Sequence, residues 1–148
     1  SVSTLMSLPW LDKCIKESMR LWSVIGVGPK RLLTQDIEYE GKVLPKGSVV
    51  HAAFHSMFRQ SWIDRCDDFV PERWDESNPQ VSELKCMFMP FNVGTRQCIG
   101  QNLAKMEIVM VVAYLVRFFE FELVSEPSVE IFLTVKATNV LFKVKSRQ

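Results

Sequence analysis

One ten-residue stretch, at residues 91–100, most constrains what this chain can fold into, because it places a cysteine between two glycines. Gly94 can adopt backbone conformations that are closed to other residues, so the chain can turn tightly there. Gly100 has no side chain, so a flat ligand can approach the backbone. The apolar run that begins at Ile99 predicts a helix. Cys98 is therefore expected in a loop, at or just before a helix N-terminus.

That position favours a reactive thiolate at Cys98. Unpaired N–H groups and the dipole at a helix N-terminus stabilise an anion, so a cysteine ionises more readily there. Arg96 adds a cation two positions away, where it could meet a carboxylate of a ligand. A thiolate, a cation and two glycines suggest a soft metal held by sulfur beside an anionic, planar body, as in thiolate-ligated haem. The alternative is an ordinary loop with a buried, inert cysteine.

The same stretch matches a known motif at each of its fixed positions. Phe91, Gly94, Arg96, Cys98 and Gly100 resemble the cysteine-ligand loop of the cytochrome P-450 family, Phe-x-x-Gly-x-Arg-x-Cys-x-Gly. The resemblance implies that these residues bind haem b (iron protoporphyrin IX). Cys98 would be the catalytic residue and the axial ligand of the iron. Phe91 would pack beside the thiolate, Arg96 would pair with a haem propionate, and Gly100 would make room.

The N-terminal part of the chain has the apolar spacing of a helix over residues 8–22. Ser7 is the predicted N-cap, and Pro9 falls in the first turn. Glu17 lies on an otherwise apolar sector of this helix, and a carboxylate on a buried sector needs a cationic partner. Arg20, one turn further on, is the nearest candidate. The alternative is a solvated surface pair, which contributes little to stability.

Two further motifs resemble the same family and occur in its order. Glu17 and Arg20 resemble its Glu-x-x-Arg pair, and residues 69–74 resemble its Phe-x-Pro-Glu-Arg-aromatic motif. In the family, the second arginine joins the first pair in a buried cluster. The resemblance therefore implies that Arg73 is a second cation for Glu17, and that the three residues hold the fold rather than perform chemistry. The alternative is that Glu72 and Arg73 lie at the surface in a mobile loop.

Between these motifs, residues 30–53 predict short strands with turns at 40–42 and 45–47. This segment resembles the small sheet that follows the Glu-x-x-Arg helix in the family. Arg31 falls where family members often place a cation against a haem propionate, and the alternative is a solvated strand arginine.

Two histidines, His51 and His55, are four positions apart, a spacing that can chelate zinc on a helix. No glutamate lies between them to act as a base, and the segment leaves a strand. We therefore expect a structural hydrogen bond from His55, as from the family's histidine near this point, and no metal site.

The rest of the chain alternates between loop, helix and strand patterns. Residues 75–85 are polar and predict an exposed loop. Residues 99–118 predict the longest helix, which is apolar nearly all round and therefore expected to be buried inside a larger protein. From Phe119 onward apolar residues alternate, which predicts a C-terminal hairpin with its turn at 136–139. The alternating residues of its middle part are Val129, Ile131, Leu133 and Val135.

Composition excludes several classes of protein. The net charge is +1, with no basic cluster, so nothing points to nucleic acid or to a polybasic membrane surface. The four cysteines are widely spaced, which argues against a zinc ribbon or a disulfide framework and favours a reducing compartment. The longest apolar run, residues 108–116, spans nine residues, well short of the roughly twenty that a bilayer needs.

The resemblance covers residues 1–148 and implies the C-terminal portion of a single cytochrome P-450 domain. The expected fold is α+β and mainly α: a Glu-x-x-Arg helix, a small β-sheet, the cysteine-ligand loop, a long buried helix and a C-terminal β-hairpin. The oxygen-activating helix of the family, and the N-terminal anchor common in eukaryotic members, would lie upstream. Membrane contact would be made through that N-terminus. The expected location is intracellular, at the endoplasmic reticulum membrane in a eukaryote and in the cytoplasm otherwise.

The implied activity of the full-length protein is that of a haem-thiolate monooxygenase. Such an enzyme inserts one oxygen atom of O2 into a small apolar organic substrate, with electrons from a reductase. Two alternatives stay open at this point. One is a haem-thiolate enzyme that rearranges peroxides, and the other is a truncated product that binds haem poorly or is not catalytic.

Overall fold

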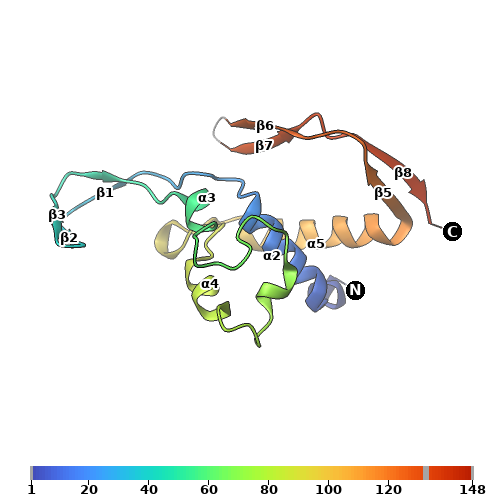
Figure 1. The fold of residues 1–148 in the computed structure, drawn as a ribbon, viewed down its shortest axis with the longest axis horizontal. Helices are drawn as coiled ribbons and strands as arrows, with labels where there is room; N and C mark the ends of the chain where they lie inside the picture. The colour runs from blue at the N-terminus through green and yellow to red at the C-terminus, as the bar shows by residue number, and fades with distance from the viewer. Residues whose placement is uncertain (1, 132–133, 148) are drawn as a thin grey trace.

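Two blocks of paired short strands, one between helices and one at the C-terminal end, occur in the computed structural model, which describes residues 2–131 and 134–147 (Figure 1). The helices are α1 (Val2–Met6), α2 (Pro9–Leu21), α3 (Phe54–Met57), α4 (Val81–Met87) and α5 (Gln101–Phe118), with 3-10 turns η1 (Pro71–Trp74) and η2 (Gly94–Arg96). The strands are β1 (Arg31–Leu32), β2 (Ile37–Tyr39), β3 (Lys42–Leu44), β4 (Val49–Val50), β5 (Phe119–Leu123), β6 (Ser128–Ile131), β7 (Val135–Thr138) and β8 (Phe142–Ser146).

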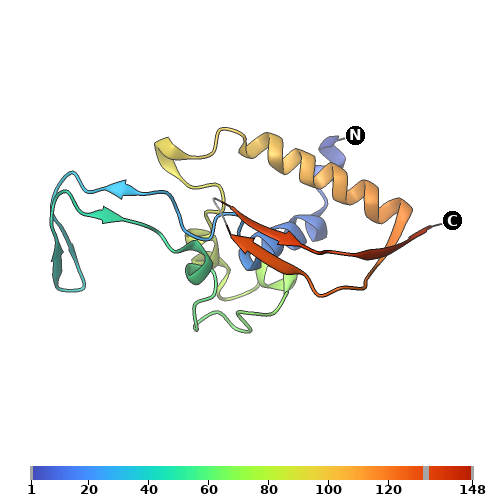
Figure 2. The same cartoon turned by 90° about the horizontal axis from the view of Figure 1, so that it is seen from above.

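The strands of the described residues pair two by two and antiparallel: β1 with β4, β2 with β3, β5 with β8, and β6 with β7. Glu40 and Gly41 connect β2 to β3 with φ values of +49° and +70°, as a tight hairpin turn requires. This confirms the predicted turn at 40–42, except that Lys42 already belongs to β3. Gly47, with φ +86°, lies in the second predicted turn. These two strand pairs extend away from the helices (Figures 1 and 2).

The C-terminal strands differ from the prediction in their connection. Residues 136–138 belong to β7, which pairs with β6, so the predicted turn at 136–139 is wrong. Phe119 in β5 faces Ser146 in β8. Along the sequence, the paired strands β5 and β8 therefore enclose the paired strands β6 and β7. Alternation of apolar residues predicts strands, but it does not determine which strands pair. Leu133, one of the alternating residues, lies outside the described residues.

Two local predictions in the helical part are wrong. Ser7 does not cap α2, whose N-cap is Leu8 without a side-chain hydrogen bond. Ser7 Oγ instead donates to the carbonyl of Thr4 at 2.9 Å, because the unpredicted helix α1 ends just before it. The predicted exposed loop at 75–85 gives way to α4, which buries Val81 and Leu84. Their spacing of three places both on one face of a short helix.

The core lies between α2, η1 and α4, where Ile63, Trp74 and Leu84 form a buried cluster. The helix α5 contacts α1 and α2 (Figure 2), and among its described residues only Val109 is buried. Apolar residues such as Val111 and Tyr114 are exposed on α5, so burial of this helix inside a larger protein stays a prediction.

Across the described parts of the chain, none of the helices combines the length and hydrophobicity that crossing a bilayer requires.

Candidate cofactor site and the ion cluster beside it

The cysteine loop connects the end of α4 to the start of α5. Two residues in the left-handed region fold it back: Asn92 with φ +63° and Gly94 with φ +69°. The N–H of Asn92 donates to the carbonyl of Met89 at 2.9 Å, and the N–H of Cys98 donates to that of Phe91 at 2.8 Å. The predicted tight turn at Gly94 is therefore present, and hydrogen bonds close the loop on both sides of it.

Cys98 is exposed and lies just before α5, whose N-cap is Gly100. The burial expected of an inert core cysteine is not observed. A Cβ added at Gly100 would lie 3.9 Å from the sulfur of Cys98, so the glycine leaves the space beside the sulfur open. Ile99 is fully exposed next to it. An accessible thiol, an open approach and an apolar side chain at a helix N-terminus fit thiolate ligation of a flat macrocycle such as haem.

The two arginines expected at haem propionates are both exposed. Arg96 lies in η2, and its carbonyl accepts a hydrogen bond from Asn92 Nδ2 at 3.2 Å. Arg31 lies on β1 opposite Val50, and its Nη1 donates to the carbonyl of its neighbour Lys30 at 3.2 Å. Within the described part of the chain, no carboxylate pairs with either guanidinium. Both cations are therefore free to meet an anionic ligand, and among the described residues no hydrogen bond joins either side chain to Cys98.

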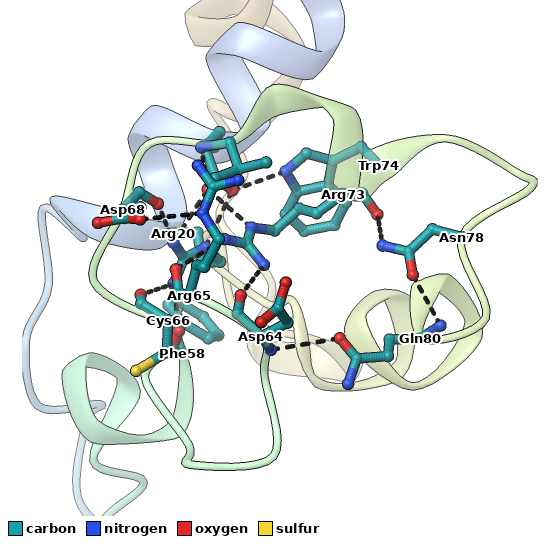
Figure 3. A network of polar contacts seen from close by, with 12 residues as sticks. Arg20, Phe58, Asp64, Arg65, Cys66, Asp68, Arg73, Trp74, Asn78 and Gln80 are labelled. Carbon is teal, nitrogen blue, oxygen red and sulfur yellow. Dashed lines mark hydrogen bonds and ion pairs between the residues drawn. The ribbon is translucent and has the colours of Figure 1, made fainter.

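The cation pairing predicted for Glu17 is present. Glu17, Arg20 and Arg73 are 0%, 1% and 4% exposed, so the interpretation as solvated surface groups is wrong. Arg20 donates Nε to Glu17 Oε2 and Nη2 to Glu17 Oε1, both at 2.9 Å, and Arg73 donates Nε to Oε1 at 2.8 Å. Arg20 and Arg73 converge from α2 and η1 in Figure 3. A carboxylate shared by two guanidiniums keeps all three groups ionised and joins distant segments.

The guanidiniums also satisfy backbone carbonyls of the irregular segment 58–68. Arg20 donates to the carbonyls of Phe58, Cys66 and Asp68 at 2.7, 2.6 and 3.1 Å, and Arg73 donates to those of Asp64 and Arg65 at 2.8 and 2.9 Å. No buried side-chain N or O atom among the described residues lacks a partner. This segment has little secondary structure of its own. The two arginines therefore supply to its carbonyls the hydrogen bonds that backbone N–H groups would supply in a helix or sheet.

The ionised state of Glu17 depends on two opposing influences on its pKa, burial and hydrogen bonding. Desolvation by burial is the largest single influence and raises the pKa of the Glu17 carboxyl. Hydrogen bonds from Arg20, from the N–H of Val70 and from Arg73 outweigh it, so the net pKa lies below the ordinary value of 4.5. Glu17 is therefore charged in the folded protein at neutral pH.

Sequence reasoning missed one donor to this carboxylate. The indole Nε1 of Trp74 donates to Glu17 Oε2 at 3.0 Å, and Trp74 is itself buried. A signal for this contact exists in the sequence, because a tryptophan in a core needs an acceptor for its N–H and this one follows Arg73 directly.

The two histidines make separate hydrogen bonds. His51 Nδ1 lies 3.1 Å from the carbonyl of Gly28 and donates to it, whereas His55 Nδ1 accepts from Arg59 Nη1 at 3.0 Å. The structural hydrogen bond expected at His55 is therefore present. Burial lowers the pKa of His55, Arg59 lowers it further, and Asp67 opposes both. Among the described residues, no three His, Cys, Asp or Glu side chains gather in a metal-binding group.

Comparison with known proteins places this geometry in a family. The sequence profile described as cytochrome P450 matches residues 1–146. The chain is 32% identical over 128 residues to benzoate 4-monooxygenase bphA of Aspergillus niger, a match that covers 83% of this chain and 25% of the relative. It is 34% identical over 122 residues to lanosterol 14-alpha demethylase of Bos taurus, covering 81% and 24%.

A solved structure agrees with these matches. The crystal structure of a cytochrome P450 (CYP102L1) superposes with a TM-score of 0.85 at 29% identity, over 98% of this chain and 33% of that one. The chain spans about a quarter of the length of the curated relatives it matches. Its helices and paired strands are an α+β portion of the same fold, and the chain belongs to the cytochrome P450 family.

Proposed function

We propose that the full protein is a haem-thiolate monooxygenase, and that this chain supplies the axial ligand of its haem b through Cys98. The observation that carries the proposal is the exposed thiol of Cys98 at the start of α5, with the space beside it kept open by Gly100. Family membership supports it, since the family is one of haem-thiolate monooxygenases. The bound haem would supply activation of O2, from which one atom enters the substrate.

The residues of this chain would bind and orient the cofactor. The Phe91 carbonyl accepts the N–H of Cys98 at 2.8 Å, which fixes the backbone from which the sulfur projects. Phe91 in turn lies under Lys105 of α5, whose Nζ is 5.8 Å from the ring centroid. Arg96 and Arg31 are the proposed cations for the haem propionates. Gly94 provides the turn that returns the chain to α5.

The relatives do not share one substrate. One relative is named for benzoate and another for lanosterol, which are chemically very different molecules. We therefore propose only a small organic substrate of largely apolar character, and a reductase as electron donor. We also propose an intracellular location, at the endoplasmic reticulum membrane if the source is a eukaryote.

The ligand assignment is tested by the carbon monoxide complex of the reduced protein, which absorbs at a characteristic long wavelength when a thiolate is the ligand. Cys98→Ser should abolish this band. Cys86→Ser, which alters another exposed cysteine, should leave it intact. A long-wavelength band that persists in Cys98→Ser would show that the ligand is another residue.

Two further measurements separate the alternatives. A monooxygenase needs both O2 and a reductase for turnover, whereas a peroxide-rearranging enzyme needs neither. Haem titration of the 148-residue chain shows whether this part of the protein binds the cofactor by itself.

A further inference from the structure

Trp74 lies between the buried ion cluster and the start of the cysteine loop. Its indole N–H donates to Glu17 Oε2 at 3.0 Å, and its ring centroid lies 4.6 Å from that of Phe88, with the planes tilted by 59°. Trp74 is 4% exposed, and Figure 3 shows its side chain beside Arg73 and Arg20. One side chain therefore contacts a carboxylate on α2 with its polar edge and the C-cap of α4 with its ring.

Phe88 is the residue at which the chain leaves α4 for the cysteine loop. Its N–H closes the helix on the carbonyl of Leu84 at 2.9 Å, while its backbone is extended, with φ −77° and ψ 92°. A second ring, that of Phe58, lies 5.8 Å from it. Three positions further on, the carbonyl of Phe91 accepts the N–H of Cys98 at 2.8 Å. Phe88 is thus linked to Cys98 through three residues of backbone and one hydrogen bond, that from Cys98 to Phe91.

The polar end of Trp74 makes its ring a fixed support. Glu17 cannot shift toward or away from the indole, because Arg20 and Arg73 hold both of its oxygens. With the N–H bonded to a fixed acceptor, rotations of the ring that break this bond are disfavoured, and a tilted aromatic pair prefers a defined geometry. An aliphatic side chain in the same place could fill the volume but could not set the orientation of Phe88.

We propose that Trp74 is a positioning residue for Cys98: its N–H anchors it on Glu17, and its ring supports Phe88 and so holds the cysteine loop in the geometry for metal ligation. The inference rests on the proposed function, because it requires Cys98 to be the iron ligand.

The test compares haem-loaded variants of the full-length protein by the fraction of reduced carbon monoxide complex that absorbs at the long, thiolate-specific wavelength. Trp74→Leu removes the ring and the N–H, and Phe88→Leu removes the partner ring. Phe54→Leu is the matched control, since Phe54 is also buried and, among the ring contacts of the described residues, stacks on Phe58, at 6.0 Å, and on neither Phe88 nor Trp74. Denaturation midpoints are measured in parallel, and spectra are recorded well below all midpoints.

Trp74→Leu and Phe88→Leu should each lower the ratio of thiolate-ligated to unligated complex by roughly two- to tenfold, the factor that an aromatic pair is worth. Phe54→Leu should lower the midpoint and leave the ratio unchanged. If all three variants lower the ratio in proportion to their loss of stability, or if Trp74→Leu does not lower it, Trp74 is only a core residue. If Trp74→Leu does not fold, Trp74→Phe is tested in its place, because it keeps a ring and loses the N–H. The proposal then requires the ratio of thiolate-ligated to unligated complex in Trp74→Phe to fall below that in Phe54→Leu.

The same spectra separate the two proposals. A wild-type protein without the thiolate band refutes the assignment of Cys98 itself. A wild-type protein with the band, and variants that do not differ from Phe54→Leu, refute only the role of Trp74.

Discussion

Arg73 donates Nε to Glu17 Oε1 at 2.8 Å across a separation of 56 positions. This contact joins η1 to α2 and brings a second positive charge to a carboxylate that already pairs with Arg20. The excess positive charge faces backbone carbonyls of residues 58–68, which accept five further hydrogen bonds from the two guanidiniums. The cluster therefore keeps one unit of positive charge, which the dipoles of these carbonyls stabilise through hydrogen bonds.

Glu17→Gln should be strongly destabilising, because it leaves two buried guanidiniums without their anion. We expect a loss of about 3–5 kcal/mol in the free energy of unfolding, the usual cost of removing one partner of a buried ion pair. Urea denaturation measures it. The control is Glu76→Gln, since Glu76 pairs with Lys85 at the surface and should show no measurable change. Equal effects of the two substitutions would contradict the structural role of the cluster.

The free energy of unfolding should also decrease at acid pH, because Glu17 becomes protonated there. Burial raises the pKa of this carboxyl, but the hydrogen bonds from Arg20, Val70 and Arg73 hold it below the ordinary 4.5 that it has in the unfolded chain. The unfolded state thus binds the proton first as pH falls. The contribution of Glu17 is complete above the unfolded pKa and is lost as pH falls through the folded pKa. The gap in unfolding free energy between wild type and Glu17→Gln should be constant from pH 7 to about 5 and narrow below that.

Gly100 and Gly94 should respond differently to alanine, although both flank Cys98. At Gly100 the φ of −84° suits alanine, and the added Cβ is in ordinary contact at 3.9 Å from the sulfur. Gly100→Ala should change the stability of the haem-free chain by less than about 0.5 kcal/mol and weaken haem binding. At Gly94 the φ of +69° disfavours alanine, while no atom lies within 4 Å of the added Cβ.

Gly94→Ala should therefore destabilise the haem-free chain by about 1–2 kcal/mol through backbone strain alone. Denaturation and haem titration of both variants give the two measurements. The reverse pattern, a stable Gly94→Ala and an unstable Gly100→Ala, would contradict the structure of the loop.

Arg96→Gln should weaken haem binding and leave the stability of the fold unchanged. The guanidinium is exposed and makes no ion pair within the described residues, so its loss should leave the unfolding free energy of the haem-free chain unchanged. If Arg96 pairs with a haem propionate, haem affinity should fall by roughly tenfold, as for a partly screened charge-assisted hydrogen bond. Arg117→Gln, which alters another exposed arginine near the end of α5, is the control and should leave haem affinity unchanged.

Some features of this protein follow from the sequence by itself, because they depend on neighbours within a few positions. The turn at Gly94, the start of a helix just after Cys98 and the hairpin turn at residues 40–42 are of this kind. The place of Glu17 on an apolar helix face belongs with them, since helical periodicity alone puts it there. The family motifs are equally local, because each occupies a single short stretch of the chain with fixed spacing.

Other features were decided only by tertiary structure, because they join segments whose separation no local pattern measures. Trp74 reaches Glu17 over 57 positions, β5 pairs with β8 rather than with the next strand, and Val81 and Leu84 are buried in a segment that is mostly polar. Each of these depends on which surfaces the whole chain brings together when it buries its core. The spacing of residues determines which side chains share a face, and packing across the fold determines what that face meets.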